Sequence, residues 1–212
     1  MIDVTTVPAG AFETNCYLVE RGDEACLAID PGGDAERIAG WIRERGLALQ
    51  AILLTHGHMD HVSATADLAA AFPDAPAFLH EKDQAWAFTE RNVFPPYYGQ
   101  PGSPGTERLA SYGDGAHPLL AGWGIEVLET PGHTPGGVCL LFPANRTVFS
   151  GDTLFQGSVG RTDLAGGDAR TLGQSLKKLA ALPDDWTVYP GHGPSTTIGD
   201  EMKNNPYMRS RG

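Results

Sequence analysis

The sequence predicts a layered α/β (α+β) fold in which two β-sheets pack together with helices outside. A β-rich block with one strong helix in the first half of the chain is followed by a second block of similar composition. The length of 212 residues suits one domain with a sizeable core. A hydrophobic content of 41% and a charged content of 19% exclude extensive disorder. We therefore expect a single domain over residues 1–212.

Short apolar runs, separated by glycine and acidic turn residues, predict the strands of the first block. These strands lie at residues 2–7, 16–19, 26–29, 51–54 and 77–79. Asp34 is the expected N-cap of a helix that runs to Arg45, with Gly46 as its stop. A further helix is expected through residues 68–71.

The second block repeats this pattern after a long irregular segment. Strands are predicted at residues 125–128, 138–142, 147–149 and 186–189, and helices at residues 171–182 and 198–205. The segment between the blocks, at about residues 87–118, contains NVFPPYYGQPGSPG and has no clear period. Irregular segments of this length are usually functional or disordered, and the aromatic residues favour a packed loop. We interpret this segment as a lid.

The charge and cysteine content restrict the partners and the compartment. The chain carries 26 acidic and 15 basic residues, a formal net charge of −11, which argues against a nucleic-acid partner. No segment reaches the roughly 18 apolar residues that span a bilayer, and the N-terminus lacks a secretory signal pattern, so no membrane partner is expected. Cys16, Cys26 and Cys139 lie in separate apolar runs, which predicts buried free thiols in a reducing compartment. We therefore expect a cytoplasmic location and leave the oligomeric state open.

The strongest functional signal is the heptapeptide THGHMDH at residues 55–61, directly after a predicted strand. It places four metal-type ligands at a strand-to-helix turn: His56, His58, Asp60 and His61. His56 and His58 are two residues apart, so both side chains can face one point. Imidazole nitrogens with a carboxylate suit zinc and also iron. Polar surface histidines are the alternative for a single His, but the whole motif disfavours that interpretation.

Three further ligand-type residues occupy glycine-containing turns just beyond predicted strands. They are His133 in TPGH, Asp152 in SGD and His192 in PGH. Each is an ordinary turn residue when taken singly. Ligands in open α/β folds gather at the carboxyl ends of strands, so we expect these junctions to converge on one crevice. The five His and two Asp then suit a pair of metal ions, with Asp152 as the natural bridging carboxylate.

The motifs THGHMDH, TPGHTPGG, SGDTLF and PGHGP occur in an order that resembles the metallo-β-lactamase-fold superfamily. Within it, the chain is most similar to the glyoxalase II (hydroxyacylglutathione hydrolase) group, and the resemblance covers nearly the whole sequence. The resemblance implies an αββα sandwich and two divalent metal ions, zinc first, with iron or a mixed zinc and iron pair as alternatives. It implies that the first ion is held by His56, His58 and His133, the second by Asp60, His61 and His192, and that Asp152 bridges them.

The chain departs from the long glyoxalase II proteins in two respects. It ends about twenty residues after His192, without the C-terminal helical region that grips glutathione in those proteins. The two tyrosines of the family fall at Asp163 and Pro194, whereas Arg161 keeps a basic residue. The chain therefore resembles the short, bacterial-type glyoxalase II-like proteins.

The resemblance implies hydrolysis of a small-molecule thioester, such as a 2-hydroxyacyl-glutathione, by a metal-bound hydroxide. A thiolate leaves readily because the pKa of a thiol is only about 8.5, so no dedicated general acid is required. Asp60 is the expected catalytic residue, as a ligand that also orients the hydroxide. Arg161, Tyr97 and Tyr98 are the candidates for substrate contact.

Other polar residues are expected to support the ligands or to be bystanders. Thr55 and Thr134 flank ligands and could orient them by hydrogen bonds. Asp30, in IDPGG, is either a carboxylate that fixes a ligand imidazole or an ordinary turn or cap residue. His80 and His117 lie outside the ligand pattern, and we interpret them as structural or surface residues.

Two other functions are kept as alternatives. The string GRTD at residues 160–163 also resembles persulfide dioxygenases, whose single iron would be held here by His58, His133 and Asp152. A non-catalytic metal-binding protein would carry the same ligands in a closed site. A β-lactamase is disfavoured chemically because an amide nitrogen is a poor leaving group, and the acidic charge disfavours a nuclease.

Overall fold

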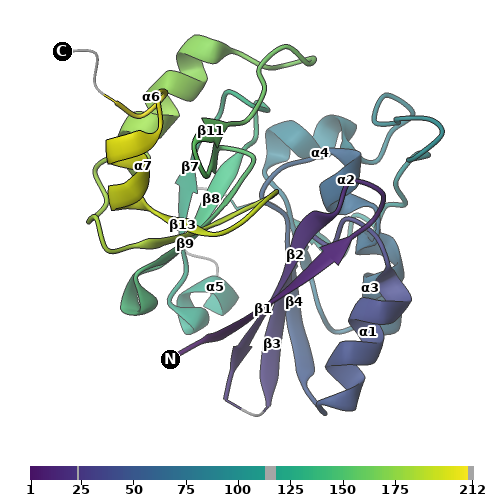
Figure 1. Ribbon diagram of the computed structural model, residues 1–212. Coiled ribbons are helices and arrows are strands. Elements are labelled where there is room, and N and C mark those ends of the chain that lie inside the picture. The colour runs from purple at the N-terminus through teal and green to yellow at the C-terminus, as the bar shows by residue number, and fades with distance from the viewer. Residues whose placement is uncertain (23, 113–117, 210–212) are drawn as a thin grey trace. The chain divides into compact units, whose positions relative to one another are not determined.

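The computed structural model describes residues 1–22, 24–112 and 118–209 (Figure 1). The chain forms two compact units, residues 1–112 and residues 113–212, and each has its own sheet and helices. Among the described residues, no helix is both long enough and apolar enough to cross a membrane. That the two units act as one domain stays a prediction.

The first unit is built on a six-stranded mixed sheet whose strands follow the chain order from β1 to β6. The strands are β1 (Asp3–Ala9), β2 (Thr14–Arg21), β3 (Ala25–Ile29), β4 (Ala48–Leu53), β5 (Ala77–Phe78) and β6 (Leu109–Ala110). β2 is antiparallel to both of its neighbours, β1 and β3, and β3 to β6 are parallel. The parallel strands β3 and β4 therefore end at the same edge of the sheet, which is where Asp30 and the THGHMDH turn follow them.

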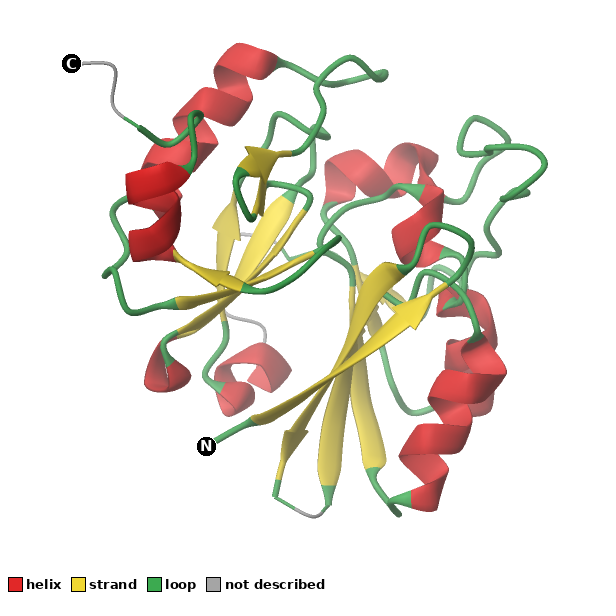
Figure 2. Ribbon diagram, viewed as in Figure 1, coloured by secondary structure: helices red, strands yellow, loops and turns green. Residues whose placement is uncertain are grey.

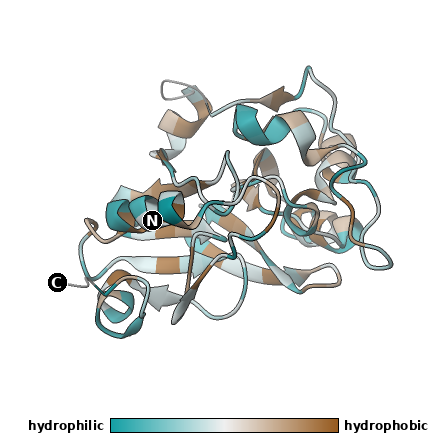
Figure 3. Ribbon diagram, turned by 90° about the horizontal axis from the view of Figure 1, so that it is seen from above, coloured by the Kyte–Doolittle hydropathy of each residue, from teal (hydrophilic) through white to brown (hydrophobic). Residues whose placement is uncertain are grey.

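The helices of the first unit are α1 (Ala35–Glu44), α2 (Met59–Val62), α3 (Thr65–Ala71) and α4 (Glu81–Ala87). Figure 2 shows α1 and α3 beside one face of the sheet, where Ile38 and Ile42 of α1 and Leu68 of α3 are fully buried against alternate strand residues. The helices mix hydrophilic and hydrophobic residues along their length (Figure 3), as expected of helices that bury one side.

The second unit is built on a five-stranded sheet in the order β13-β12-β9-β8-β7. Its strands are β7 (Glu126–Glu129), β8 (Val138–Phe142), β9 (Thr147–Gly151), β12 (Thr187–Pro190) and β13 (Thr196–Thr197), and β10 (Leu154–Phe155) pairs with β11 (Ser158–Val159) in a separate hairpin. Its helices are α5 (Pro118–Trp123), α6 (Ala169–Leu179) and α7 (Ile198–Asn204), with a short 3-10 turn at Pro143–Asn145. Leu172, Leu176 and Leu179 of α6 form one buried stripe that packs on residues of β8 and β9.

The strands and helices predicted from the sequence are present, with ends shifted by at most three residues. The three cysteines are free and buried, as predicted. The sequence patterns did not reveal the short elements α2, α4, α5, β6, β10, β11 and β13, because two to seven residues are too few to show a period.

Asp34 occupies the predicted N-cap position of α1, but its side chain does not cap the helix. Asp34 precedes α1 but has a left-handed backbone (φ 54°), and its side chain makes no capping hydrogen bond. Its carboxylate instead accepts a hydrogen bond from the Gly10 amide at 3.0 Å and pairs with Arg37 at 3.1 Å. A tertiary contact 24 residues away has replaced the local cap. The predicted stop is confirmed, since Gly46 has φ 67° and its amide bonds to the carbonyl of Arg43.

The segment expected to be a lid is described only up to residue 112. Within it, Phe94 pairs with Tyr98 across a tight turn, and β6 joins its end to the sheet. Residues 113–117, including His117, lie outside the described residues. The lid therefore stays a prediction.

Candidate metal centre

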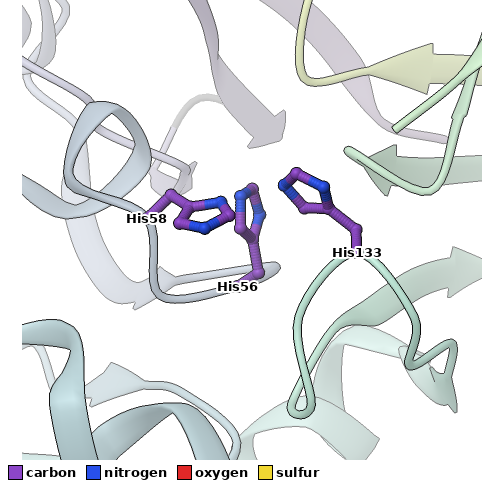
Figure 4. Close-up of side chains that lie close together, drawn as sticks. All are labelled: His56, His58 and His133. Atoms are coloured by element: carbon purple, nitrogen blue, oxygen red, sulfur yellow. The ribbon is translucent and has the colours of Figure 1, made fainter. Parts of the chain in front are cut away.

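The first unit holds four of the predicted ligands on a single turn after β4. Figure 4 shows His56 and His58 on this loop, with their imidazole rings side by side. The ring centroids of these two residues are 4.9 Å apart, and those of His56 and His61 are 4.1 Å apart. His56, Asp60 and His61 are buried, whereas His58 is partly exposed. The folded turn therefore gathers the side chains that the sequence spacing had placed together.

Asp30 organises this turn from the end of β3. It has a left-handed backbone (φ 50°) and is almost fully buried. Its carboxylate accepts hydrogen bonds from the Thr55 amide at 2.7 Å and the Thr55 hydroxyl at 2.6 Å, and it lies 3.0 Å from Nδ1 of His61. Thr55 Oγ1 in turn lies 3.1 Å from Nδ1 of His56. Of the two alternatives for Asp30, the contact with an imidazole is the one observed, and Thr55 likewise contacts the ring of a predicted ligand.

This network assigns the imidazole tautomers of His56 and His61. An ionised Asp30 only accepts hydrogen bonds, so Nδ1 of His61 carries the proton that faces it. Because the Thr55 hydroxyl donates to Asp30, its oxygen accepts from Nδ1 of His56. In both rings Nε2 then carries the lone pair, which is the arrangement that metal-ligating histidines use.

Asp60 lies in the first turn of the short helix α2 and is mostly buried. Its Oδ2 accepts a hydrogen bond from the Thr14 hydroxyl at 3.3 Å and lies 3.7 Å from Nε2 of His61. A buried carboxylate beside the lone-pair nitrogen of an imidazole is a suitable neighbour for a cation. The position of Asp60 thus fits the ligand role predicted for it.

The second unit brings together the other three predicted ligands around Asp152. Its Oδ2 lies 3.5 Å from Nε2 of His133 and 3.8 Å from Nε2 of His192. Figure 4 shows His133 on a loop of this unit, and its Nδ1 donates a hydrogen bond to the carbonyl of Arg161 at 2.7 Å. Nε2 of His133 is therefore the nitrogen that carries the lone pair beside Asp152.

Glycines make the close approaches in the second unit possible. Gly132, just before His133, has φ 133°, and a Cβ there would lie 2.3 Å from the backbone nitrogen of Leu172. A Cβ on Gly160 would lie 1.8 Å from the carbonyl oxygen of Asp152 and 3.1 Å from Nδ1 of His133. No side chain fits at either position, so these glycines let the ligand loops pack as they do.

The donor chemistry of both units fits metal ions. In the first unit, one ligand atom from each of Asp30, His56 and His61 lies within 4.8 Å of the others. In the second, one carboxylate stands between two imidazole nitrogens, as a bridging ligand would. Imidazole with carboxylate is the donor set of zinc and of non-haem iron. Since Asp30 already accepts two hydrogen bonds from Thr55 and faces Nδ1 of His61, it acts as a support and not as a ligand.

Sequence reasoning missed two groups of supporting residues. In the first unit, Asp83 and Asn92 hydrogen-bond the backbone of the THGHMDH turn. In the second, the buried Glu201 accepts hydrogen bonds from the amide of Gly157 and the side chain of Asn205, and Asn205 donates to the carbonyl of Ser158. None of these residues belongs to a recognisable motif, because each acts on a segment at least 24 residues away, or on an ordinary helical neighbour.

The predicted substrate contacts stay predictions. The exposed Arg161 guanidinium forms two 2.7 Å hydrogen bonds to Asp163 and holds the pKa of that carboxyl at about 2. Tyr97 is 60% exposed, whereas Tyr98 is buried against Phe12, and burial raises its pKa. The structural interpretation of His80 is confirmed, because its side chain caps α4.

Residues 9–192 match the Metallo-beta-lactamase superfamily, and the chain belongs to this superfamily and has its fold. Hydroxyacylglutathione hydrolase GloC of Haemophilus influenzae is 38% identical over 99% of this chain and 100% of its own length. The crystal structure of BLEG-1 B3 metallo-beta-lactamase superposes with a TM-score of 0.89 and 36% sequence identity, covering 99% of this chain and 100% of that one. TTHA1623 in a di-iron-bound form is 40% identical, with a TM-score of 0.83 over 96% of this chain and 99% of that one. The chain is thus a metallohydrolase of the superfamily with a His and Asp metal-binding cluster.

Proposed function

We propose that this metallohydrolase is dinuclear and cleaves a thioester such as a 2-hydroxyacyl-glutathione. The observation that carries the proposal is the complete set of seven ligand-type residues: four on the turn after β4, and Asp152 with the two histidines beside it. The likeness to a hydroxyacylglutathione hydrolase over the full length of both chains supports the same activity.

The proposed centre joins the ligands of both units in the pattern of the family. His56, His58 and His133 would hold one ion, and Asp60, His61 and His192 would hold the other. Asp152 would be the ligand shared by both. Zinc is the first choice for this donor set, and the di-iron form of TTHA1623 supports iron or a mixed pair as alternatives.

When bound, a metal pair would supply a hydroxide at neutral pH and polarise the substrate carbonyl. The residues of the chain prepare the site for this chemistry. Asp30 holds the His61 ring with Nε2 as its lone-pair nitrogen, and the Arg161 carbonyl does the same for His133. Asp60, fixed by the Thr14 hydroxyl, orients the nucleophile as the catalytic residue. A leaving thiolate has a conjugate-acid pKa of about 8.5, so the chain needs no separate proton donor.

The substrate is a small molecule, with Arg161, Tyr97 and Tyr98 as its contacts and residues 87–118 as a lid over the single domain. The acidic charge supports neither a nucleic-acid nor a membrane partner. The buried free cysteines support a cytoplasmic location: burial raises the pKa of Cys26 to about 12 and that of Cys139 to about 11, so neither thiol is prepared for exchange.

The test is a substrate screen on one protein sample whose metal content has been measured. Release of free thiol from lactoyl-glutathione is followed with a thiol reagent, beside oxygen consumption with glutathione persulfide and hydrolysis of a chromogenic β-lactam. We expect two metal ions per chain and thiol release. Metal-replete protein without thiol release would contradict the proposal. One iron per chain with oxygen consumption would favour the dioxygenase, and β-lactam hydrolysis alone would favour the activity named for BLEG-1.

A further inference from the structure

We propose that Asn92, together with Asp83, is a positioning residue that sets the angle between His56 and His58 for metal binding. The inference rests on the proposed metal site and adds residues to it that are not ligands. Asp83 lies on α4, and Asn92 lies five residues beyond that helix. Both are buried, with exposed fractions of 0% and 4%.

The two side chains hydrogen-bond the backbone on both sides of Gly57. Asp83 Oδ2 accepts from the Gly57 amide at 2.9 Å. Asn92 Nδ2 donates to the Gly57 carbonyl at 2.8 Å, and Asn92 Oδ1 accepts from the Met59 amide at 3.1 Å. Because Asn92 uses a donor and an acceptor at once, it pairs with the turn much as a neighbouring strand would.

These bonds fix the peptide planes that connect the two histidines. The Gly57 amide belongs to the plane after His56, the Gly57 carbonyl to the plane before His58, and the Met59 amide to the plane after His58. Only two backbone dihedrals per residue are soft, so holding three successive planes holds the dihedrals of Gly57 and His58. The relative direction of the Cα–Cβ bonds of the two histidines, from which the imidazoles project, depends on those dihedrals.

Helix α4 also packs directly on this part of the turn. A Cβ on Gly57 would lie 3.1 Å from Cβ of Asp83 and 3.2 Å from the Trp86 ring, so the helix approaches the turn closely at this glycine. The Trp86 ring lies 5.4 Å from the His58 imidazole. A third Asn92 hydrogen bond, from Nδ2 to the Ala87 carbonyl at 2.6 Å, ties Asn92 to the end of the same helix. Helix α4 and Asn92 therefore support the turn together.

The test compares Asn92→Ala with a matched variant on α4, Gln84→Ala. Gln84 Nε2 also donates to two carbonyls, of Leu79 and Ala110, but does not hydrogen-bond the THGHMDH turn. Zinc affinity of the metal-free protein is measured by competition with a chromophoric chelator. We expect Asn92→Ala to lose about 10- to 100-fold in zinc affinity, as supports of metal ligands typically do, and Gln84→Ala to keep the wild-type affinity. Equal affinities in the two variants would overturn the proposal.

A second measurement needs neither metal nor activity. Hydrogen exchange of the Gly57 and Met59 amides is followed by NMR in metal-free wild-type protein and in Asn92→Asp. We expect both amides to be protected in the wild type. In Asn92→Asp, which keeps the acceptor but loses the donor to the Gly57 carbonyl, we expect faster exchange at the turn but not within α4. Unprotected amides in the wild type would overturn the proposal even if every Asn92 variant failed to fold.

The proposed function and this inference fail in different ways. Wild-type protein that binds zinc but releases no thiol from lactoyl-glutathione would contradict the thioesterase while leaving the role of Asn92 standing. Thiol release by the wild type, together with unchanged zinc affinity in Asn92→Ala, would contradict the role of Asn92 and leave the thioesterase standing. The variant Asp83→Asn, which keeps an oxygen acceptor for the Gly57 amide, is expected to retain zinc affinity, whereas Asp83→Ala is expected to lose it.

Discussion

The two units hold their metal-type ligands in opposite ways. In the first, four ligands lie within the six residues from 56 to 61, and side chains from elsewhere in the unit hold that short stretch of backbone. In the second, three ligands spread over residues 133–192 follow three different strands, and glycine contacts between loops set their approach. The geometry of the compact motif depends on the side chains that support it. The geometry of the dispersed set depends on strand register and on glycines, which leave room for the loops to approach.

The largest loss of activity is expected from a substitution of Asp152, the carboxylate that lies between the two histidines of the second unit. Asp152→Ala removes the group that lies beside both His133 and His192. Metal assistance contributes several kcal/mol to such reactions, so we expect thioester hydrolysis to fall by more than about 100-fold and bound metal to fall with it. Activity and metal content are measured on the same sample. Full metal content with full activity would show that Asp152 is not a ligand.

The first unit is tested by changing a support and leaving the ligands intact. Asp30→Asn keeps a residue that tolerates a left-handed backbone, but it leaves one oxygen for Thr55 and His61 together. We expect zinc affinity to fall by about 10- to 100-fold and unfolding to become easier by about 1–3 kcal/mol. The matched control is Asp34→Asn, at an exposed residue of nearly the same φ that also accepts a backbone hydrogen bond. Equal losses in both variants would mean that only the backbone conformation matters.

The second unit is tested by adding one carbon atom. In Gly160→Ala the new Cβ would lie 1.8 Å from the Asp152 carbonyl oxygen, so the backbone must move. Overpacking of this kind costs about 1–3 kcal/mol, and we expect about a tenfold loss of zinc affinity through displacement of Asp152 and His133. Gly173→Ala on α6 is the control, since no atom lies within 4 Å of its added Cβ. If both variants bind zinc as the wild type does, the glycine contacts do not set the ligand geometry.

The same contrast explains what could be predicted from the sequence. The ligand-bearing turns were recognisable because each is a short local pattern, an apolar strand running into a glycine-containing turn with His or Asp. The fold class was recognisable because those patterns occur in the order of the superfamily. Asp83, Asn92 and Glu201 were not recognisable, because their roles depend on contacts between distant segments. The side-chain contact of Asp34 was not predictable for the same reason, since its carboxylate accepts from the amide of Gly10 and not from an amide of its own helix.

The smallest difference between the units is expected in the reactivity of their cysteines, which occur in both. Burial raises the pKa of Cys139 in the second unit from 9.0 to about 11, and burial also raises the pKa of Cys26 in the first, to about 12. A raised thiol pKa means that the folded protein disfavours the thiolate, so ionisation favours unfolding only as the pH rises above about 9. At pH 8 the thiolate fraction of Cys139 is about a hundredfold below that of an unperturbed thiol.

We therefore expect iodoacetamide at pH 8 to modify none of the three cysteines in the time that alkylates urea-unfolded protein completely, as read by mass spectrometry. Cys16, whose pKa burial raises furthest, should be the last to react as the pH is increased. Because the thiols are buried in both units, their protection should be equal with and without bound zinc. Rapid alkylation of Cys139 alone would show that the dispersed ligand loops of the second unit open more readily than the compact turn of the first.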